Sequence, residues 1–204
     1  LYEGIAVNGE NKGLITYIRT DSTNLSTEFT AKAREIIRNK FGDSFVSETV
    51  RNFKNKVKNA QEAHEAIRPS DPSIFPKDLS KSLEPNLLKL YELIWNRSIA
   101  TQASQAITET LTIRVCNKEK DIELSSSFSK VKFKGFKVLY DTNNSNNNNE
   151  KEINKNITKN SLIKLVNIKK NQHFTEPPPR YSEASLIKKM EELGIGRPST
   201  YANI

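Results

Sequence analysis

Residues 13–26 have the sequence Gly-Leu-Ile-Thr-Tyr-Ile-Arg-Thr-Asp-Ser-Thr-Asn-Leu-Ser, in which an apolar run is followed by a hydroxyl-rich one. The apolar and β-branched residues from Leu14 to Ile18 predict a short buried strand. The polar residues after it predict a turn, and Ser26 is a good N-cap for a following helix. The stretch therefore predicts a strand, a turn and a helix, with Tyr17 near the end of the strand.

Tyr17 and Arg19 suggest a chemistry for this strand end. Alternate side chains of a strand point the same way, so both can face one site. A phenol has a pKa of about 10, and a nearby guanidinium favours its ionised form and binds phosphate oxygens through paired donors. The pair can therefore attack a phosphodiester and hold the phosphotyrosine that results. From spacing alone, the favoured interpretation is that Tyr17 is a core aromatic and Arg19 a surface charge.

Three stretches together resemble one family. Residues 13–22 closely resemble the active-site tyrosine motif of the type IA DNA topoisomerases. Residues 63–70, Ala-His-Glu-Ala-Ile-Arg-Pro-Ser, resemble the histidine-containing block of that family in its bacterial topoisomerase I form, rather than its topoisomerase III form. Residues 174–185 and 194–201 resemble a later block of the same enzymes. The resemblance covers nearly all of the chain except the stretch from about residue 117 to 160.

The resemblance implies a function. Tyr17 is expected to attack a backbone phosphate of single-stranded DNA, retain the 5′-phosphate and release a 3′-hydroxyl. Arg19 is expected to stabilise the phosphate and the phenolate. Passage of the other strand and resealing relax negative supercoils without ATP, because one phosphodiester is exchanged for another. The catalytic residues predicted from the resemblance are thus Tyr17 and Arg19.

The resemblance also implies DNA contacts outside the tyrosine motif. His64 is expected to contact DNA and aid cleavage, although by itself it could simply cap a turn. Arg197 precedes a predicted helix start, which is a natural phosphate site, although it could be a solvated turn residue. The predicted DNA-binding residues are His64, Arg68, Arg197 and Thr200.

The metal site of the family is expected elsewhere. Members bind Mg²⁺ through an acidic cluster in an N-terminal domain, and the chain contains no Asp-x-Asp. We therefore predict no metal ligands here and expect the isolated chain to bind single-stranded DNA weakly without cleaving it. The zinc-binding repeats common in the family are not seen either. Because the chain starts at Leu1 and its one methionine is Met190, we interpret it as the central part of a longer protein.

Composition agrees with a nucleic-acid partner. The 204 residues carry a formal net charge of +8, with a pI near 9.4 and a mean hydropathy of −0.65. Such basicity suits a polyanion, and we expect single-stranded and underwound duplex DNA as partners. The sequence shows no membrane span or signal peptide. Cys116 is the single cysteine, which fits a reducing compartment, and we expect a cytoplasmic, nucleoid-associated monomer.

The first half of the chain predicts an α-rich domain over residues 1–103. Residues 1–4 are interpreted as the tail of a helix, and Asn8-Gly9 as a turn. Two helices follow, one ending at Gly42 and one starting at Pro85, whose apolar stripe includes Trp95 as a core residue. The basic residues of the first helix are expected to be mostly solvated, with a few along a DNA path; they are Lys32, Arg34, Arg38 and Lys40.

The second half predicts a change of period. Residues 107–115 alternate as a strand does, and further strand-like runs lie at 121–128, 131–140 and 161–169, with a polar Asn-rich loop at 143–149. These predict a β-rich domain over 104–172. A helix capped by Ser182 and ended by Gly194, then a turn into a second helix, begin a third domain over 173–204.

The fold class is therefore α+β. The resemblance implies that domain 1–103 is related to winged-helix and CAP-like folds, that 104–172 is an arch, and that 173–204 starts a helical DNA-binding domain. Two other functions stay open at this stage. One is a non-enzymatic helix-turn-helix DNA-binding module, for which no base-reading side chains stand out. The other is a relaxase or tyrosine recombinase, but two distant histidines cannot supply the metal-binding triad of a relaxase.

Overall fold

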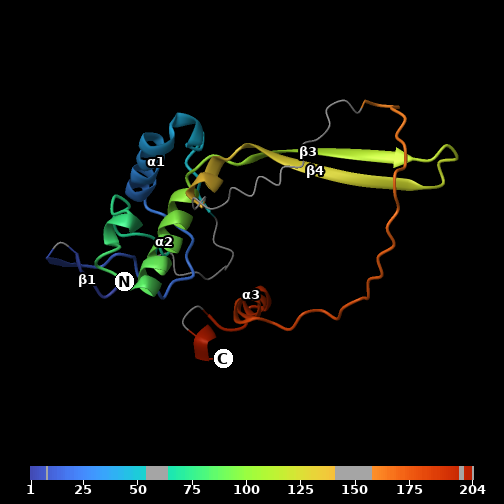
Figure 1. Cartoon of the computed structure of the whole chain (residues 1–204). Helices are drawn as coiled ribbons and strands as arrows, with labels where there is room; N and C mark the ends of the chain where they lie inside the picture. The colour runs from blue at the N-terminus through green and yellow to red at the C-terminus, as the bar shows by residue number, and fades with distance from the viewer. Residues whose placement is uncertain (8, 54–63, 141–157, 198–199, 204) are drawn as a thin grey trace. The chain divides into compact units, whose positions relative to one another are not determined.

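The computed structural model describes residues 1–7, 9–53, 64–140, 158–197 and 200–203. The chain divides into two compact units, Leu1–Asn147 and Asn148–Ile204, and each is described by itself. Helices and small antiparallel sheets make up the described parts, so the α+β class is confirmed at this level (Figure 1). The predicted three-domain division and the relation to winged-helix folds stay predictions. Within these ranges, no helix has both the length and the apolar character needed to span a membrane.

Two helices form the framework of the first unit. Helix α1 runs from Thr27 to Phe41, and the Ser26 side chain accepts a hydrogen bond from the backbone N–H of Phe29, as expected of an N-cap. Gly42 ends α1 with φ 97°, a conformation that favours glycine. Helix α2 runs from Pro85 to Ala100. The predicted start of each helix and the glycine stop are therefore confirmed.

The core of this unit lies between α1, α2 and the segments that lead into them. Trp95 on α2 is buried and its indole N–H donates to the carbonyl of Pro72 at 2.9 Å, so its predicted packing role is confirmed. Short 3₁₀ turns η1 (Asp43–Phe45) and η2 (Pro76–Leu79) join the helices to this core. Its buried apolar members include Leu14, Ile15, Phe29, Ala33, Ile37, Leu79, Tyr91 and Ile99.

The chain begins with a hairpin rather than a helix tail. Strands β1 (Ile5–Val7) and β2 (Glu10–Lys12) pair antiparallel, and residues 1–4 are not helical. The prediction of a helix tail is therefore wrong. A stretch of four residues is too short to reveal a period, which is why the pattern misled. Gly9 lies in the turn of the hairpin with φ 84°, and Asn8 lies outside the described residues.

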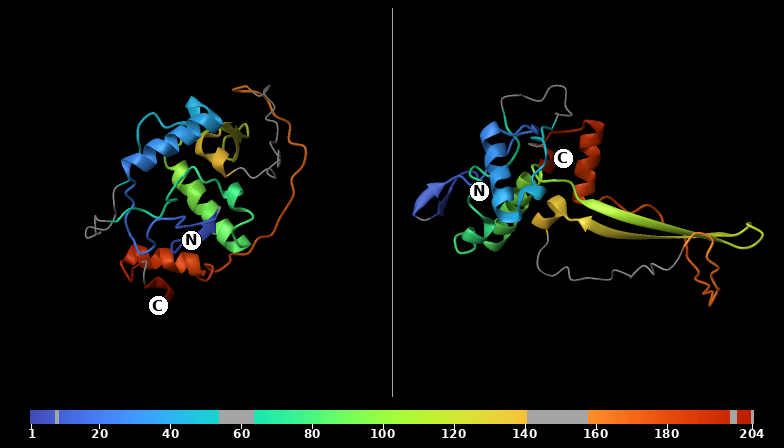
Figure 2. Two further views of the ribbon diagram at one scale, coloured as in Figure 1. Left: turned by 90° about the vertical axis from the view of Figure 1, so that its left-hand side faces the viewer. Right: turned by 90° about the horizontal axis from the view of Figure 1, so that it is seen from above.

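A long hairpin follows α2. Strand β3 (Ile107–Cys116) confirms the alternation seen in the sequence, and it pairs antiparallel with β4 (Glu123–Phe133). The two strands predicted at 121–128 and 131–140 are thus one strand ending at Phe133, followed by the 3₁₀ turn η3 (Gly135–Leu139). Ring contact between Phe45 and Phe133 joins the base of the hairpin to the helical part. From this base the β3–β4 hairpin extends away from helices α1 and α2 (Figure 2).

Gly135 explains why the strand stops where it does. Its φ is 50°, and a Cβ at this position would lie 2.3 Å from the carbonyl oxygen of Gln105. The chain therefore turns out of the sheet at a point where only glycine fits, and the apolar residues after it form a turn.

The second unit contains helix α3 (Glu183–Leu193) and a 3₁₀ turn, η4 (Tyr201–Asn203). Ser182 caps α3 and Gly194 ends it in the left-handed conformation with φ 70°, as predicted. The strand predicted at 161–169 is absent, because this described stretch has no regular structure and Leu162 is fully exposed. Alternating residue types indicate which side chains would lie on each face of a strand. A strand also needs a neighbouring strand with which its backbone can form hydrogen bonds.

Candidate functional site

Tyr17 lies on an extended segment that is paired with the histidine block. Ile15 forms an antiparallel bridge with Pro69, and the N–H of Ser70 donates to the carbonyl of Leu14 at 3.0 Å. The N–H of Thr16 donates to the carbonyl of Arg68 at 2.9 Å. The strand predicted at residues 14–18 is therefore an extended segment with a single bridge, Ile15–Pro69, because the histidine block pairs with it over only a few residues. The pairing brings the two predicted motifs together.

The hydroxyl of Thr16 adds a second tie between these motifs. It donates to the carbonyl of Ala66 at 2.8 Å and accepts from the N–H of Arg68 at 3.0 Å. The N–H of Ala66 in turn donates to the carbonyl of Asn24, at 2.8 Å. The histidine block is therefore bonded to the chain on both sides of Tyr17. Thr16 was missed in the sequence, where it looks like one more β-branched strand residue.

Aromatic rings surround the side chain of Tyr17. His64 lies with its ring centroid 5.3 Å from that of Tyr17, and Tyr2 meets the same ring edge-on at 5.5 Å. Tyr17 is 39% exposed, so it is not the core aromatic of the alternative interpretation. A partly exposed phenol next to an imidazole is accessible to a phosphate and has a hydrogen-bonding group nearby. Tyr2 was also missed, and no sequence pattern pointed to it.

Arg68 lies beneath this surface rather than on it. Its side chain is 12% exposed, and its Nε donates to the carboxylate of Glu65. One Nη donates to the carbonyl of Pro69 at 2.8 Å, and the other reaches the hydroxyl of Ser26 at 3.5 Å. The guanidinium also stands 4.8 Å from the ring centroid of Phe29. These contacts join the histidine block to the start of α1.

Arg19 lies just beyond Tyr17, where the chain bends at residues 18–19. Both side chains are exposed, but the bend interrupts the regular extended geometry from which a shared face was predicted. The hydroxyl-rich turn follows: the N–H of Ser22 donates to the hydroxyl of Thr20, and the N–H of Asn24 donates to that of Ser22. The turn predicted after Tyr17 is thus built from side-chain hydroxyls.

Arg197 and Thr200 lie in the second unit and contact each other. The N–H of Arg197 donates to the hydroxyl of Thr200 at 2.9 Å, and the N–H of Tyr201 donates to the carbonyl of Arg197 at 3.1 Å. Pro198 and Ser199, which were predicted to start the second helix, lie outside the described residues. The hydroxyl of Thr200 therefore stabilises the turn that carries Arg197.

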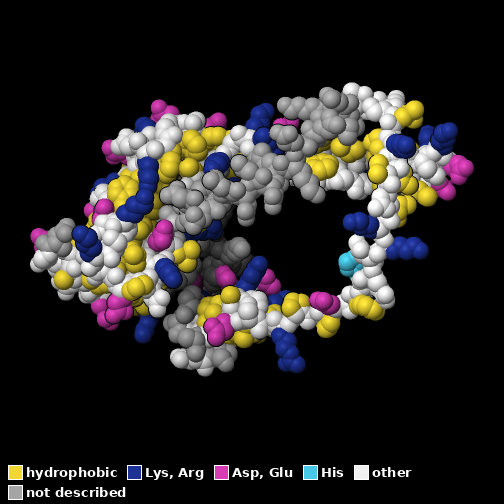
Figure 3. All heavy atoms as spheres, in the orientation of Figure 1, with side chains coloured by type: hydrophobic (Ala, Val, Ile, Leu, Met, Phe, Trp, Pro, Cys, Tyr) yellow, Lys and Arg dark blue, Asp and Glu magenta, His cyan; other side chains and the backbone are white. Residues whose placement is uncertain are grey.

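The four basic residues of α1 have partners within the chain. Lys32 pairs with Glu28 at 2.9 Å and Arg38 pairs with Asp43 at 2.7 Å, while Arg34 donates to the carbonyl of Thr49. On the face shown in Figure 3, Lys and Arg side chains are interspersed with acidic ones over the helical part. These contacts favour the solvated-face interpretation for α1 over a DNA path.

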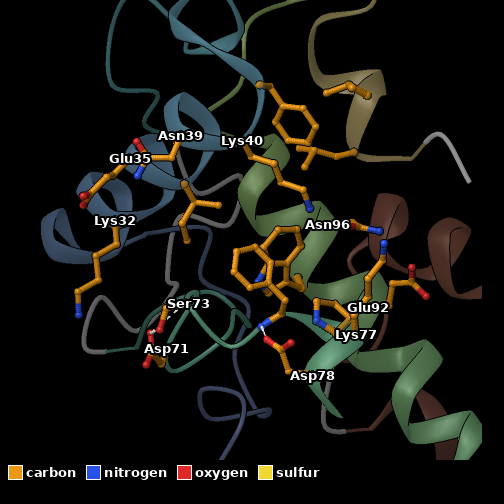
Figure 4. Close-up of a pocket in the computed structure, with 17 residues that line it drawn as sticks. Lys32, Glu35, Asn39, Lys40, Asp71, Ser73, Lys77, Asp78, Glu92 and Asn96 are labelled. Carbon is orange, nitrogen blue, oxygen red and sulfur yellow. Dashed lines mark hydrogen bonds between the residues drawn. The ribbon is translucent and has the colours of Figure 1, made fainter. Parts of the chain in front are cut away.

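A pocket of about 1140 Å³ lies between α1, α2 and residues 71–78 (Figure 4). The ammonium of Lys40 stands within 5.2–5.7 Å of the ring centroids of Phe41, Phe75 and Trp95. The Lys40 ammonium therefore already makes cation–π contacts with the aromatic rings that line this pocket. None of the predicted site residues lines this pocket, so it is separate from Tyr17.

Asp71 at the rim of this pocket shows the local electrostatics. Burial acts to raise the pKa of its carboxyl, but two hydrogen bonds from Ser73, at 2.7 and 3.0 Å, outweigh that effect. The ammonium groups of Lys32 and Lys12 add to the lowering, and the net pKa lies below its usual value. Asp71 is thus held as a carboxylate, in keeping with a structural role.

The described residues do not offer a magnesium site. Within the described ranges, no three His, Cys, Asp or Glu side chains lie close enough together to hold a metal ion. The carboxylate of Glu65, which is nearest in sequence to His64, is paired with Arg68.

Comparison with known proteins identifies relatives of the whole chain. A family model described as DNA topoisomerase matches residues 1–204. DNA topoisomerase 1 of Rickettsia bellii is 45% identical over 205 residues, covering 100% of this chain. DNA topoisomerase 1 of Campylobacter jejuni is 43% identical over 202 residues, covering 99% of it. The full-length topoisomerase I structure from Thermotoga maritima superposes with a TM-score of 0.74 at 31% identity, covering 99% of this chain.

These relatives are much longer than the chain. The match spans 26% of the Rickettsia protein, 28% of the Campylobacter protein and 31% of the Thermotoga structure. The chain therefore corresponds to between a quarter and a third of each.

Proposed function

Because the chain belongs to the DNA topoisomerase family, we propose that it supplies the nucleophile with which a type IA enzyme breaks and rejoins one DNA strand. The observation that carries the proposal is the setting of Tyr17. Its phenol is partly exposed, stands beside His64, and lies on a backbone segment fixed by hydrogen bonds to the histidine block. A nucleophile needs access to its substrate and a defined position, and Tyr17 has both.

The chemical step exchanges one ester for another. The Tyr17 oxygen forms a bond to phosphorus as the bond from phosphorus to the 3′-oxygen breaks. The proton lost by the phenol is balanced by the proton that the released 3′-oxygen gains to become a 3′-hydroxyl. The 5′-phosphate is then held as a phosphotyrosine. The free hydroxyl reverses the step after the other strand has passed, which relaxes negative supercoils without ATP.

Positive and hydrogen-bonding groups assist this exchange in the proposal. Arg19 stabilises the charge that develops on the phosphate, since its guanidinium offers paired donors to two oxygens. His64 contacts the same phosphate region from beside the Tyr17 ring. Arg197 and Thr200 bind the DNA backbone from the turn before η4. Arg68, which we predicted as a DNA contact, is better placed to hold His64 and Tyr17 in register.

The substrate and the cofactor belong to the same proposal. Single-stranded and underwound duplex DNA are the proposed partners, and the net charge of +8 suits such polyanions. We propose that the enzyme is a monomer and that it acts on the bacterial nucleoid in the cytoplasm. Mg²⁺ is proposed to bind outside the residues described here. The non-enzymatic alternative gains no support, because the relatives that match the whole chain carry the name of an enzyme.

The test is covalent trapping of DNA in the full-length enzyme. Tyr17→Phe keeps the ring and removes only the nucleophilic oxygen, so it should abolish the protein–DNA adduct that survives denaturation and should leave single-strand binding largely intact. Tyr140→Phe is the matched control, since Tyr140 is 40% exposed and lies in the same unit. An adduct in Tyr17→Phe at the wild-type level would disprove the assignment.

A further inference from the structure

Tyr2 is the second aromatic neighbour of Tyr17, and the function described above gives it no part. Its ring meets the Tyr17 ring edge-on, with centroids 5.5 Å apart and planes at 63°. His64 contacts the same ring, with a centroid distance of 5.3 Å and an interplanar angle of 39°. Edge-to-face aromatic contacts at this distance have a preferred geometry and are not merely apolar. The Tyr17 ring is thus contacted by two other rings.

The backbone holds Tyr2 in this position. The N–H of Leu14 donates to the carbonyl of Leu1 at 2.8 Å, so the first residues of the chain run beside the segment that carries Tyr17. A Cβ at Gly13 would lie 2.8 Å from the carbonyl oxygen of Tyr2, so this close approach requires glycine. The β1–β2 hairpin returns the chain between these two points. Gly13, the first residue of the tyrosine motif, therefore allows the backbone of Tyr2 to approach this segment closely.

We propose that Tyr2 is a positioning residue for the nucleophile, acting through its ring. Together with His64 it restricts the orientations of the Tyr17 side chain, so that the phenol oxygen is presented to the phosphate before DNA binds. Such restriction raises the rate of the chemical step because less orientational freedom is lost on the way to the transition state. The inference rests on the proposed role of Tyr17 as nucleophile. Tyr2 itself takes no part in bond making.

The contact can be tested without any reaction. In the full-length enzyme, incorporated fluorotyrosine gives a fluorine NMR signal for each tyrosine, and Tyr17→Phe identifies the signal of Tyr17. We expect Tyr2→Ala to shift the Tyr17 signal, because the edge-on ring no longer affects it. Tyr140→Ala is the control, since Tyr140 is similarly exposed and packs on Phe136 instead, and it should leave the Tyr17 signal in place. An unmoved Tyr17 signal in Tyr2→Ala would overturn the proposal.

The consequence for rate is tested in the full-length enzyme with a single-stranded oligonucleotide. At saturating DNA, Tyr2→Ala should form the covalent adduct about tenfold more slowly, with a dissociation constant close to that of the wild type. Tyr2→Phe keeps the ring and should restore the rate, and Tyr140→Ala should match the wild type. A wild-type rate in Tyr2→Ala, or a loss confined to DNA affinity, would overturn the proposal.

Three further outcomes separate this inference from the proposed function. If Tyr2→Phe is as slow as Tyr2→Ala, the hydroxyl rather than the ring matters, and the inference fails while Tyr17 keeps its role. If Tyr17→Phe still traps DNA, the proposed function fails and the inference fails with it. An inactive Tyr17→Phe with a fully active Tyr2→Ala rejects only the inference.

Discussion

Tyr17 and Arg197 lie on segments that are fixed in different ways. The hydroxyl of Thr16, next to Tyr17, bonds to Ala66 and Arg68, which are 50 and 52 positions further along the chain. The backbone of Arg197 bonds to Thr200, three positions away, and to Tyr201. Contacts distant in sequence place Tyr17 relative to His64, whereas local contacts define the shape of the Arg197 turn. Tyr17, the proposed nucleophile, is therefore pre-positioned within its own unit.

This difference predicts two kinds of mutational effect. Loss of a contact that holds Tyr17 should slow the chemical step, because the phenol no longer starts from the reactive geometry. Loss of a group on the Arg197 turn should weaken DNA binding and leave the chemical step unchanged at saturation. Experiments that separate rate from affinity therefore test the comparison.

The largest effect is expected for Arg68→Ala. The change removes the pair with Glu65, the bond to Pro69 and the stacking on Phe29, which should cost about 2 kcal/mol in the free energy of unfolding. Adduct formation at saturating DNA should fall by about 100-fold, because the histidine block loses its tie to α1. Urea denaturation and rapid-quench trapping measure the two effects.

A salt titration distinguishes this role from the direct DNA contact that the sequence suggested for Arg68. A lost phosphate contact would reduce the slope of log affinity against log salt by about 0.7, and a positioning role would leave it unchanged. Arg34→Ala, which removes a partly buried arginine with one backbone bond, is the control and should change stability by less than about 0.5 kcal/mol. A smaller slope with a normal adduct rate would reject the positioning role.

The next effect is expected for Thr16→Val. Valine keeps the shape but leaves the carbonyl of Ala66 and the N–H of Arg68 without the hydroxyl, at a cost of about 1–2 kcal/mol. The rate of adduct formation should fall by about tenfold with little change in affinity. Thr16→Ser retains the hydroxyl and should recover most of both losses. If valine and serine behave alike, the hydroxyl bridge does not hold the two motifs together.

A smaller effect of the opposite kind is expected for Arg197→Ala. Binding of a single-stranded oligonucleotide should weaken, and the salt slope should decrease by about 0.7 for one lost phosphate contact. The adduct rate at saturating DNA should match the wild type. Lys188→Ala on α3, which removes a charge from the same unit, serves as the control. A slow adduct rate at saturation would show that Arg197 also acts in the chemical step.

The contrast also shows which features a sequence reveals. The N-cap at Ser26, the glycine stops at Gly42 and Gly194 and the alternation of β3 depend on neighbouring residues, and all were predicted. The strand at 161–169 was wrong because a strand also depends on a partner edge that alternation does not describe. Local signals therefore predicted individual elements better than their pairing.

The candidate site divides in the same way. Motif resemblance indicated Tyr17 and His64, and the structure brings their rings together. It did not indicate Thr16 or Tyr2, whose importance arises only from contacts made in the fold. Arg68 was assigned to DNA because an arginine in a motif looks like a ligand, whereas its burial against Phe29 is visible only in three dimensions.

The smallest effect concerns the segment that follows the histidine block, where Tyr91 on α2 donates a hydrogen bond to the carbonyl of Ile74 at 2.9 Å. Tyr91→Phe should cost about 1 kcal/mol near neutral pH and leave the adduct rate unchanged, since this bond lies beyond the segment that contacts Thr16. Burial, aided by Asp71 and Asp78, raises the pKa of Tyr91 above its ordinary value.

The sign of the pH effect follows from that shift. The unfolded chain loses this proton at a lower pH than the folded chain does, so the contribution of Tyr91 to stability is complete below about pH 10 and is lost as the pH rises further. Phenylalanine has no such proton, so the stability difference between wild type and variant should narrow above about pH 10. Urea denaturation across this pH range measures the difference, and a constant gap would mean that the Tyr91 hydroxyl ionises as readily in the folded protein as in the unfolded chain.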